Sequence, residues 1–262
     1  IRDVFQRHFP PRGDVLLQID NLCGERFQNV SLHVRAGEIV GLAGLVGSGR
    51  SEVVRAAFGI DSYSRGEVRI RGNRMPRGNP QRLSQEGVAF LPEDRKREGL
   101  ALSLSIRENA VISACRRLNP LGIVNGRKER SIVREFVDKL GISTPTLEKL
   151  VNFLSGGTQQ KVVLAKWLIT QASIFIFDEP TRGIDVGSKS SIYSLMDELV
   201  GLGAGIVMIS SELPEVLGMS DRIYVMAQGR IAGELDREHA DQVSVIQLAF
   251  SNAGAAREES IQ

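Results

Sequence analysis

Hydrophobic and polar positions follow two different periods along the chain. Short apolar runs bounded by glycine, proline or polar residues are typical of buried strands, whereas apolar residues spaced three or four apart are typical of helices. The pattern predicts strands at residues 15–20, 27–34, 38–43, 66–72, 87–92, 173–177, 205–210 and 221–226, and a hairpin at 228–234. It predicts helices at residues 52–58, 156–167, 189–201, 213–217 and 243–251.

The order of these elements predicts an α/β fold. Strands that alternate with helices favour a mostly parallel sheet covered on both faces, and the first strands together with residues 66–72 predict a small antiparallel β subdomain. Helical spacing from about residue 105 to 150, broken at residues 119–120 and 143–145, predicts an inserted helical subdomain at about residues 103–153. We expect a linker at residues 1–14, one domain at residues 15–253 and a disordered tail at residues 254–262.

Composition excludes several classes of protein. The 262 residues carry 33 lysines and arginines against 31 aspartates and glutamates, and a net charge of +2 is too small to argue for nucleic acid as a partner. No apolar run approaches the ~18 to 20 residues that span a bilayer, and the amino end lacks the hydrophobic segment of a signal peptide. Cys23 and Cys115 lack metal-ligand spacing, so we expect free thiols in a reducing compartment. Because the chain does not begin with methionine and residues 9–13 resemble a linker, we expect it to be part of a longer protein.

The most informative stretch runs from Gly44 to Ser51, and we call it the phosphate loop. It lies between a predicted strand and a predicted helix, and it matches the pattern G-x-x-x-x-G-K-[ST] except that arginine replaces the lysine. Glycines let consecutive backbone N–H groups turn inward, and the helix start adds partial positive charge, so the loop can bind nucleotide phosphates. The alternative is an ordinary glycine-rich turn. The residues expected to contact the nucleotide are Gly44, Gly47, Ser48, Gly49, Arg50, Ser51 and Glu52.

Two adjacent carboxylates follow a predicted buried strand. Asp178 and Glu179 come directly after an apolar run, which places them at the carboxyl end of a strand, where open α/β sheets bind their ligands. Mg²⁺ prefers oxygen ligands, so Asp178 and the Ser51 hydroxyl are expected to hold it. Glu179 is expected to orient and deprotonate the attacking water. A plain surface turn after a strand is the alternative.

A second helix start carries a hydroxyl and two glycines. Residues 154–160, which we call the signature segment, read Leu-Ser-Gly-Gly-Thr-Gln-Gln. Ser155 is predicted to cap this helix, and the bare backbone beside it forms a second anion site. One nucleotide does not need two such sites, although a well-capped helix is the simpler interpretation of the motif alone. The residues expected to contact a partner's nucleotide are Ser155, Gly156, Gly157, Thr158 and Gln159.

At this point the chain resembles the ATP-binding cassette (ABC) ATPases, and the resemblance covers nearly its whole length. More narrowly, it is similar to the carboxy-terminal cassette of the tandem ATPases that energise bacterial importers of ribose, galactose, arabinose and xylose. The segments that carry this likeness are residues 44–52, 92–100, 178–187 and 210–216. The resemblance implies an ABC-type P-loop NTPase fold, ATP and Mg²⁺ as cofactors, and a place at the cytoplasmic face of the bacterial inner membrane. It also implies three partners: a second cassette bound head to tail, membrane permease subunits, and indirectly a periplasmic sugar-binding protein.

Three positions depart from an active cassette, and all lie at the γ-phosphate end. Arg50 replaces the loop lysine, Glu93 stands at the glutamine-loop position that senses Mg²⁺, and Ser211 replaces the switch histidine. Serine donates a hydrogen bond but carries no charge, and arginine changes the geometry of phosphate contact. We therefore expect Mg-ATP binding with slow hydrolysis, while the signature segment completes the site of a partner cassette. The alternatives are a catalytically inactive regulatory module, a soluble ABC protein acting on ribosomes or DNA, and a P-loop kinase. This chain has neither the long basic arm nor the coiled-coil insertion usual in such soluble ABC proteins. It also has no obvious lid with several arginines, as expected of a P-loop kinase.

Overall fold

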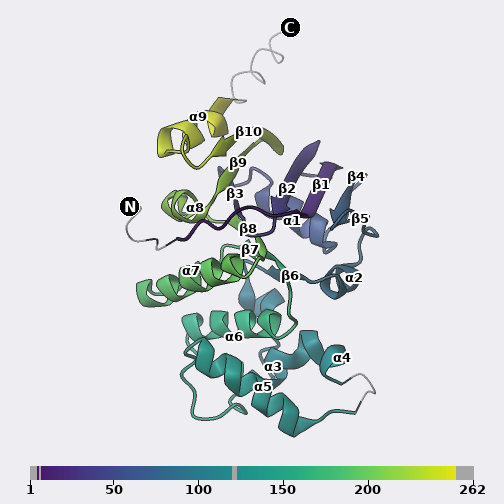
Figure 1. Cartoon of the computed structure of the whole chain (residues 1–262), viewed down its shortest axis with the longest axis vertical. Helices are drawn as coiled ribbons and strands as arrows, with labels where there is room; N and C mark the ends of the chain where they lie inside the picture. Colours follow the sequence, from purple (N-terminus) through teal and green to yellow (C-terminus); the bar gives the residue numbers. More distant parts are fainter. Residues whose placement is uncertain (1–4, 6, 120–122, 252–262) are drawn as a thin grey trace.

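The computed structural model describes residues 5, 7–119 and 123–251, and its central layer is a six-stranded sheet (Figure 1). The strands lie in the order β10-β9-β3-β8-β7-β6, and every neighbouring pair is parallel except β9 and β10. The tail predicted at residues 254–262, and part of the predicted linker, lie outside the described residues. The strand bounds are β3 Ile39–Gly44, β6 Val88–Leu91, β7 Ile174–Asp178, β8 Gly205–Ile209, β9 Arg222–Ala227 and β10 Arg230–Asp236.

Helices cover both faces of this sheet, as the continuous apolar runs predict. Every residue of β7 and β8 is buried. Along β9 the side chains alternate: Ile223 and Val225 pack with α8 (Leu213–Met219) and α9 (Gln242–Ser251), whereas Tyr224 belongs to the larger core. Successive side chains of a strand point to opposite faces, so this division places one core on each side of the sheet.

A second, antiparallel sheet has the strand order β2-β1-β4-β5. Its bounds are β1 Val15–Cys23, β2 Val30–Arg35, β4 Arg65–Ile70 and β5 Asn73–Arg74. The three residues of β2 with even numbers are buried and those between them are more exposed, which is the period-2 pattern of a sheet with one packed face. This layer shares its apolar core with α1 (Arg50–Phe58), so the phosphate loop before α1 lies next to both sheets.

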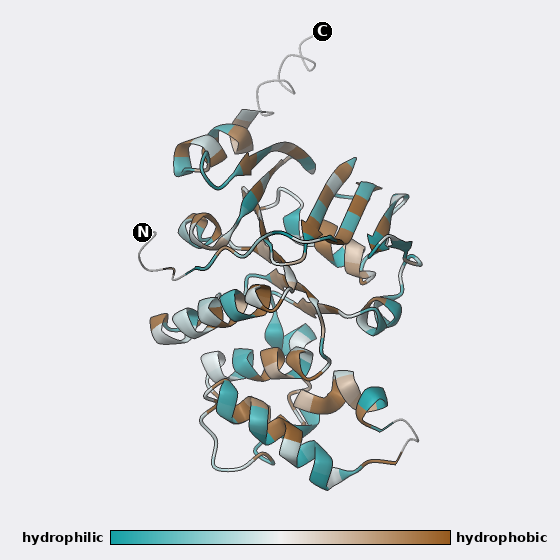
Figure 2. Ribbon diagram, viewed as in Figure 1, coloured by the Kyte–Doolittle hydropathy of each residue, from teal (hydrophilic) through white to brown (hydrophobic). Residues whose placement is uncertain are grey.

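The elements of the predicted helical region are α3 Ile106–Val111, η3 Ile112–Ala114, α4 Cys115–Leu118, α5 Gly126–Lys139, the short turn η4 Val151–Phe153 that precedes α6 (Gly156–Leu168), and a bridge between Ser105 and Leu150. Three of these elements, α3, η3 and α5, pack on α6. Figure 2 shows hydrophobic and hydrophilic residues alternating along α5, whose buried side includes Val133 and Val137. Because α6 also contacts β6, it joins this region to the central sheet. No helix in the described part of the chain has the length and hydrophobicity needed to cross a membrane.

Capping residues explain most differences between the predicted and observed boundaries. Helix α7 (Val186–Gly201) begins three residues earlier than predicted because the Asp185 carboxylate accepts the Ser188 N–H at 2.9 Å. Helix α2 (Pro80–Gln85) was not predicted, since Leu83 is its one buried residue, and it begins after an Asn79 cap. The charged segment at residues 93–99, for which no element is predicted, contains a π-helical turn, η2 (Arg95–Gly99), because Asp94 accepts two backbone N–H groups.

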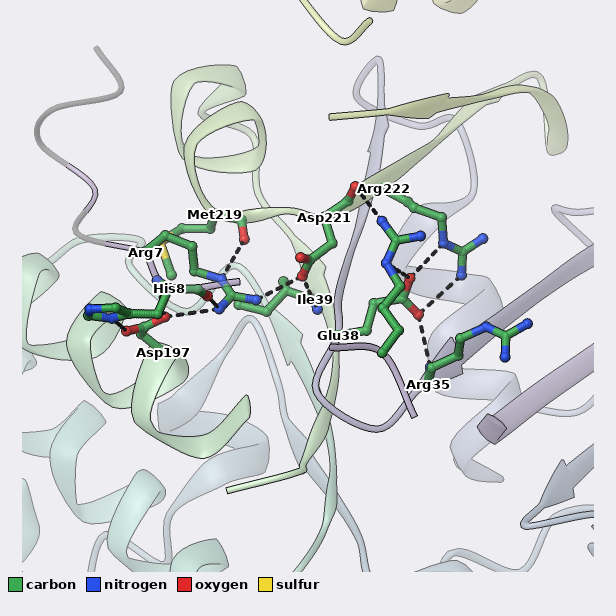
Figure 3. A network of polar contacts seen from close by, with 10 residues as sticks. Arg7, His8, Arg35, Glu38, Ile39, Asp197, Met219, Asp221 and Arg222 are labelled. Carbon is green, nitrogen blue, oxygen red and sulfur yellow. Dashed lines mark hydrogen bonds and ion pairs between the residues drawn. The ribbon is translucent and has the colours of Figure 1, made fainter. Parts of the chain in front are cut away.

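The segment before β1 is held against the core by buried charges (Figure 3). The Arg7 side chain is fully buried and pairs with Asp197 of α7 at 2.9 Å and with Asp221 at 2.7 Å. Asp221 also accepts the backbone N–H of Ile39 at the start of β3. Residues within the range predicted as a linker therefore join α7 to the beginning of the central strands.

Candidate functional site

The phosphate loop connects β3 to α1 and leaves the first turn of α1 without a side-chain cap. Gly49 is the N-cap at φ 96°, and no side chain bonds to the helix start there. Gly44 has φ 151°, and a Cβ on it would lie 2.4 Å from the Met226 carbonyl oxygen, so glycine is required. The Ser48 hydroxyl oxygen is buried without a hydrogen-bond partner among the described residues. Free N–H groups and an unpartnered buried hydroxyl fit an anion such as a phosphate.

Arg50 is buried, and its guanidinium reaches across to the end of β8. Its Nη1 donates to the Ser210 carbonyl oxygen at 3.1 Å, and its residual exposure is 8%. Burial lowers the pKa of Arg50, and the charges of Glu179 and Asp178 oppose that effect. The side chain at the position of the expected loop lysine is thus tied to the backbone of a neighbouring strand end.

Ser51 and Asp178 meet at the carboxyl end of β7. The Ser51 hydroxyl donates to Asp178 Oδ1 at 3.0 Å, and Asp178 is 2% exposed. Burial raises the pKa of Asp178 to about 6, against the opposing effect of the Ser51 hydrogen bond. In the described part of the chain no three His, Cys, Asp or Glu side chains gather into a metal centre. One hydroxyl with one carboxylate nevertheless suits Mg²⁺, which usually takes few protein oxygens and completes its shell with phosphates and water.

Glu179 and Ser211 form a second pair beside the first. The Ser211 hydroxyl donates to Glu179 Oε2 at 3.0 Å, while the Glu179 backbone N–H donates to the Ile209 carbonyl oxygen at 3.0 Å. Glu179 has φ 51°, a left-handed conformation that is uncommon for a residue with a side chain. The structure therefore brings together Ser51 with Asp178, and Glu179 with Ser211, on neighbouring strand ends.

Glu93 is paired with a residue outside these two pairs. Its carboxylate forms an ion pair with Arg182, and both side chains are exposed. Among the described residues no hydrogen bond joins Glu93 to Ser51 or Asp178. Glu52, the last residue of the predicted nucleotide set, forms an exposed ion pair with Arg26.

The signature segment begins α6 with the predicted cap. Ser155 is exposed, and its hydroxyl accepts the Thr158 N–H at 3.3 Å. A Cβ on Gly157 would lie 2.7 Å from the Ser188 hydroxyl, so the glycine allows α6 to approach the start of α7. Gln159 does not share the exposed face: it is 2% exposed and donates to the Val151 carbonyl oxygen at 3.0 Å. Ser155 is thus open to a second molecule, whereas Gln159 holds the helix start from inside.

Two residues near the site, Arg95 and Glu215, were assigned no chemistry from the sequence. Arg95 is only partly exposed and donates to the Arg182 carbonyl oxygen at 2.9 Å. Burial lowers its pKa. Glu215 is 2% exposed beneath the strand ends, although it lies inside the segment 210–216 that carries the resemblance. Only the motif itself could have drawn attention to it, since an acidic residue at the start of a helix is ordinarily a surface residue.

Exposed apolar side chains lie in the phosphate loop, before the signature segment and at the start of α7. Val46 of the phosphate loop is 93% exposed, Phe153 before the signature segment is 69% exposed, and Val186 at the start of α7 is 84% exposed. Large apolar groups exposed at functional segments are typical of surfaces that another molecule covers.

Comparison with known proteins identifies the family of the chain. A sequence model of the family described as ABC transporter matches residues 27–182. The chain is 49% identical over 252 residues to a ribose import ATP-binding protein of Streptomyces avermitilis, covering 96% of the chain and 48% of that protein. It is 46% identical to a putative ribose/galactose/methyl galactoside import ATP-binding protein of Rhizobium etli, over 95% of the chain and 48% of that protein. The chain therefore spans about half the length of the curated relatives it matches.

Solved structures show the same fold at low sequence identity. A dimeric, post-hydrolysis ATP-binding cassette, MJ0796 bound to ADP and Pi, superposes with a TM-score of 0.74 at 22% identity, over 85% of the chain and 99% of the cassette. The ADP conformation of the cassette MJ1267 superposes with a TM-score of 0.73 at 21% identity, over 90% and 98%. The predicted fold class, with its parallel core and antiparallel β layer, is confirmed.

Proposed function

Because the chain belongs to the ABC transporter family, we propose that it is a cassette that binds Mg-ATP and powers import of a monosaccharide across the bacterial inner membrane. The observation that carries the proposal is the pairing of Ser51 with Asp178 and of Glu179 with Ser211 beside an uncapped helix start. An anion site, a magnesium donor set and a carboxylate base are the parts that ATP hydrolysis needs.

The roles of the residues follow from their chemistry. The free N–H groups of the phosphate loop hold the phosphates, and the Arg50 guanidinium reaches them only after it leaves the Ser210 carbonyl oxygen. Ser51 and Asp178 hold Mg²⁺, which supplies charge neutralisation of the phosphate oxygens when it is bound. Glu179 accepts a proton from the attacking water, and the Ser211 hydroxyl keeps that carboxylate oriented.

Slow turnover of this site is part of the proposal. Arg50 is engaged with the Ser210 carbonyl oxygen, and Glu93 with Arg182, so neither is free to act at the γ-phosphate without rearranging. Ser211 supplies a hydrogen bond where a charged imidazolium would stabilise the developing charge. The exposed Ser155 supports a division of labour in which the signature segment completes the site of a second cassette.

The transported sugar and the membrane partners are proposed from the relatives. Their names specify import of ribose or of ribose, galactose and methyl galactoside. We propose that a permease subunit binds at a cavity of about 580 Å³ between α2 and the start of the helical region. Its rim includes Ile112, which is 52% exposed, together with Arg116 and Arg117. An apolar anchor beside basic side chains suits a short amphipathic helix of a permease at the cytoplasmic membrane face.

Binding of Mg-ATP to the chain tests the proposal. We expect Ser51→Ala to weaken Mg²⁺-dependent binding of a fluorescent ATP analogue by about tenfold or more, because it removes one charge-assisted contact. Ser113→Ala, on an exposed residue of η3, is the matched control and should leave binding unchanged. A wild-type chain that binds no Mg-ATP would refute the proposal.

Turnover separates the proposed enzyme from the regulatory alternative. We expect slow hydrolysis, below about 1 s⁻¹, that Glu179→Gln abolishes while Mg-ATP binding persists. Faster turnover in the isolated chain would contradict the proposed slow site. Binding without any hydrolysis would favour the catalytically inactive regulatory module.

A further inference from the structure

Glu215 is a buried carboxylate that four side chains contact directly below the candidate site. It lies on α8, is 2% exposed, and accepts the Thr181 hydroxyl at 2.8 and 2.7 Å. The Ser210 hydroxyl donates to it at 2.8 Å and Lys189 Nζ at 3.1 Å, and the Tyr193 hydroxyl completes the set. None of these side chains belongs to the chemistry assigned above, yet together they saturate both carboxylate oxygens.

The carboxylate joins the two segments that carry the catalytic pair. Thr181 lies two residues after Glu179, in the turn that follows β7, and is 1% exposed. Ser210 directly precedes Ser211, and its own carbonyl oxygen receives the Arg50 guanidinium. Both segments are therefore fixed to one buried group, Glu215, which sets the distance between them.

The turn after β7 needs such an anchor. Glu179 has φ 51°, and a non-glycine residue in this region stores on the order of 1 kcal/mol of backbone strain that the surroundings must hold. The Ile209 carbonyl holds the Glu179 N–H on one side, and the bond from Thr181 to Glu215 holds the turn on the other.

The charge state of Glu215 is consistent with an anchor rather than a proton donor. Burial raises the pKa of Glu215, but the hydrogen bonds from Tyr193, Thr181, Ser210 and Lys189 lower it by more, so the net shift of the pKa is downward. A buried carboxylate is costly unless its partners are complete, and complete networks are rigid. Glu212, three residues earlier on the same segment, also pairs with Lys189, but its side chain is 54% exposed.

We propose that Glu215 is a positioning residue for ATP hydrolysis, which holds the Glu179 turn and the Ser211 segment in the arrangement that the reaction requires. The inference rests on the proposed function. The positioning role predicts that loss of Glu215 weakens binding of the transition state more than binding of the nucleotide. Among the described residues, Glu215 contacts none that is expected to bind the nucleotide, and its one indirect link runs through Ser210, which accepts a hydrogen bond from Arg50.

The test compares Glu215→Gln with Glu212→Gln in the full chain. The affinity for MgADP and for MgADP with fluoroaluminate, a mimic of the transferring phosphoryl group, is measured together with turnover. We expect the wild type to bind the mimic more tightly than MgADP alone. In Glu215→Gln this preference, and turnover, should fall about 10- to 100-fold while MgADP affinity changes less than about threefold. Glu212→Gln should match the wild type, and Ser210→Ala, which removes one donor, should give a smaller loss of the same kind.

Each outcome has one meaning. Equal effects of Glu215→Gln and Glu212→Gln, or a parallel loss of MgADP affinity and mimic affinity, overturn the positioning role and leave the proposed function intact. A wild type that binds MgADP without preferring the mimic likewise overturns the positioning role. A wild type that does not bind MgADP refutes the proposed function and this inference with it. If Glu215→Gln does not fold, an unchanged preference in folded Ser210→Ala overturns the role.

Discussion

Replacing Asp178 by asparagine should stabilise the nucleotide-free protein. The carboxylate is 2% exposed, and its one hydrogen bond within the described residues comes from Ser51 at 3.0 Å. Burial raises its pKa to about 6, so at neutral pH the fold holds a charge in a site that disfavours it. Asparagine keeps the shape and an oxygen that can accept the Ser51 hydroxyl, and it removes the charge.

The size of the effect follows from the pKa. The difference between about 6 and the ordinary value of 3.8, at ~1.4 kcal/mol for each pH unit, corresponds to a cost of about 3 kcal/mol for the ionised carboxylate. The buried amide NH₂ group of asparagine needs a hydrogen-bond partner, and this requirement offsets about 1 kcal/mol of the gain in stability. We therefore expect Asp178→Asn to raise the free energy of unfolding by about 1 to 3 kcal/mol at pH 8.

The pH dependence has a defined sign. The folded-state pKa of Asp178 is raised, so the stability that its protonated form contributes is complete below 3.8 and is lost as the pH rises through about 6. The variant lacks this group. Its advantage over the wild type should accordingly be largest above pH 6 and should shrink toward zero near pH 4.

Chemical unfolding followed by the fluorescence of Trp167, the single tryptophan, measures the effect. Unfolding is carried out at pH 5, 6 and 8 with EDTA and without nucleotide, and Asp138→Asn on an exposed position of α5 serves as the control. Added Mg-ATP should raise the unfolding midpoint of the wild type but not that of Asp178→Asn. A variant no more stable than the wild type at pH 8 would refute the reasoning.

Three further predictions concern other buried groups and the helix cap. Burial lowers the pKa of Lys166 to about 8, so the wild type should gain stability as the pH rises from 8 to 10.5. Measured by denaturant unfolding relative to Lys166→Met, the gain in the free energy of unfolding should be about 3 kcal/mol. A difference between the two proteins that stays constant with pH would contradict this prediction. Glu38→Gln should cost about 2 kcal/mol in unfolding, because it removes the buried carboxylate 2.7 Å from the Arg222 guanidinium and leaves the exposed Glu234 as its counter-charge; a loss under 1 kcal/mol would contradict this. Ser155→Ala should lower stability by about 1 kcal/mol through loss of the cap and leave Mg-ATP binding by the isolated chain unchanged in a fluorescence titration; weaker binding would show that the signature segment serves the chain's own site.

Local features of the site could be predicted from the sequence because they depend on neighbours in the chain. The apolar run before Asp178 defines β7 and hence the strand end, and Ser155 before two glycines defines a cap. Contacts between distant segments could not be predicted. The bond from Arg50 to the Ser210 carbonyl and the ion pair of Glu93 join residues more than 80 positions apart, and only the packed sheet brings them together.

The same reasoning explains which elements of the fold were missed. Helix α2 buries one leucine and has no apolar stripe, so its start is defined by Asn79 and Pro80 rather than by hydrophobic spacing. The sequence predicts that the first strands and residues 66–72 form the antiparallel sheet, but not the order of its strands, which depends on pairing between β1 and β4, whose residues lie about 50 positions apart. Periodicity identifies strands but carries no information on such partners.

The buried Arg7 has a practical consequence for anyone who shortens the protein. A version that starts at Phe9 would keep the phosphate loop and every proposed catalytic residue, yet it would leave Asp197 and Asp221 without the cation that neutralises both. Such a trimmed protein would be expected to express poorly or precipitate, and the fault would be misread as a defect of the nucleotide pocket. The choice of first residue is therefore a variable to control before any low activity is attributed to the site itself.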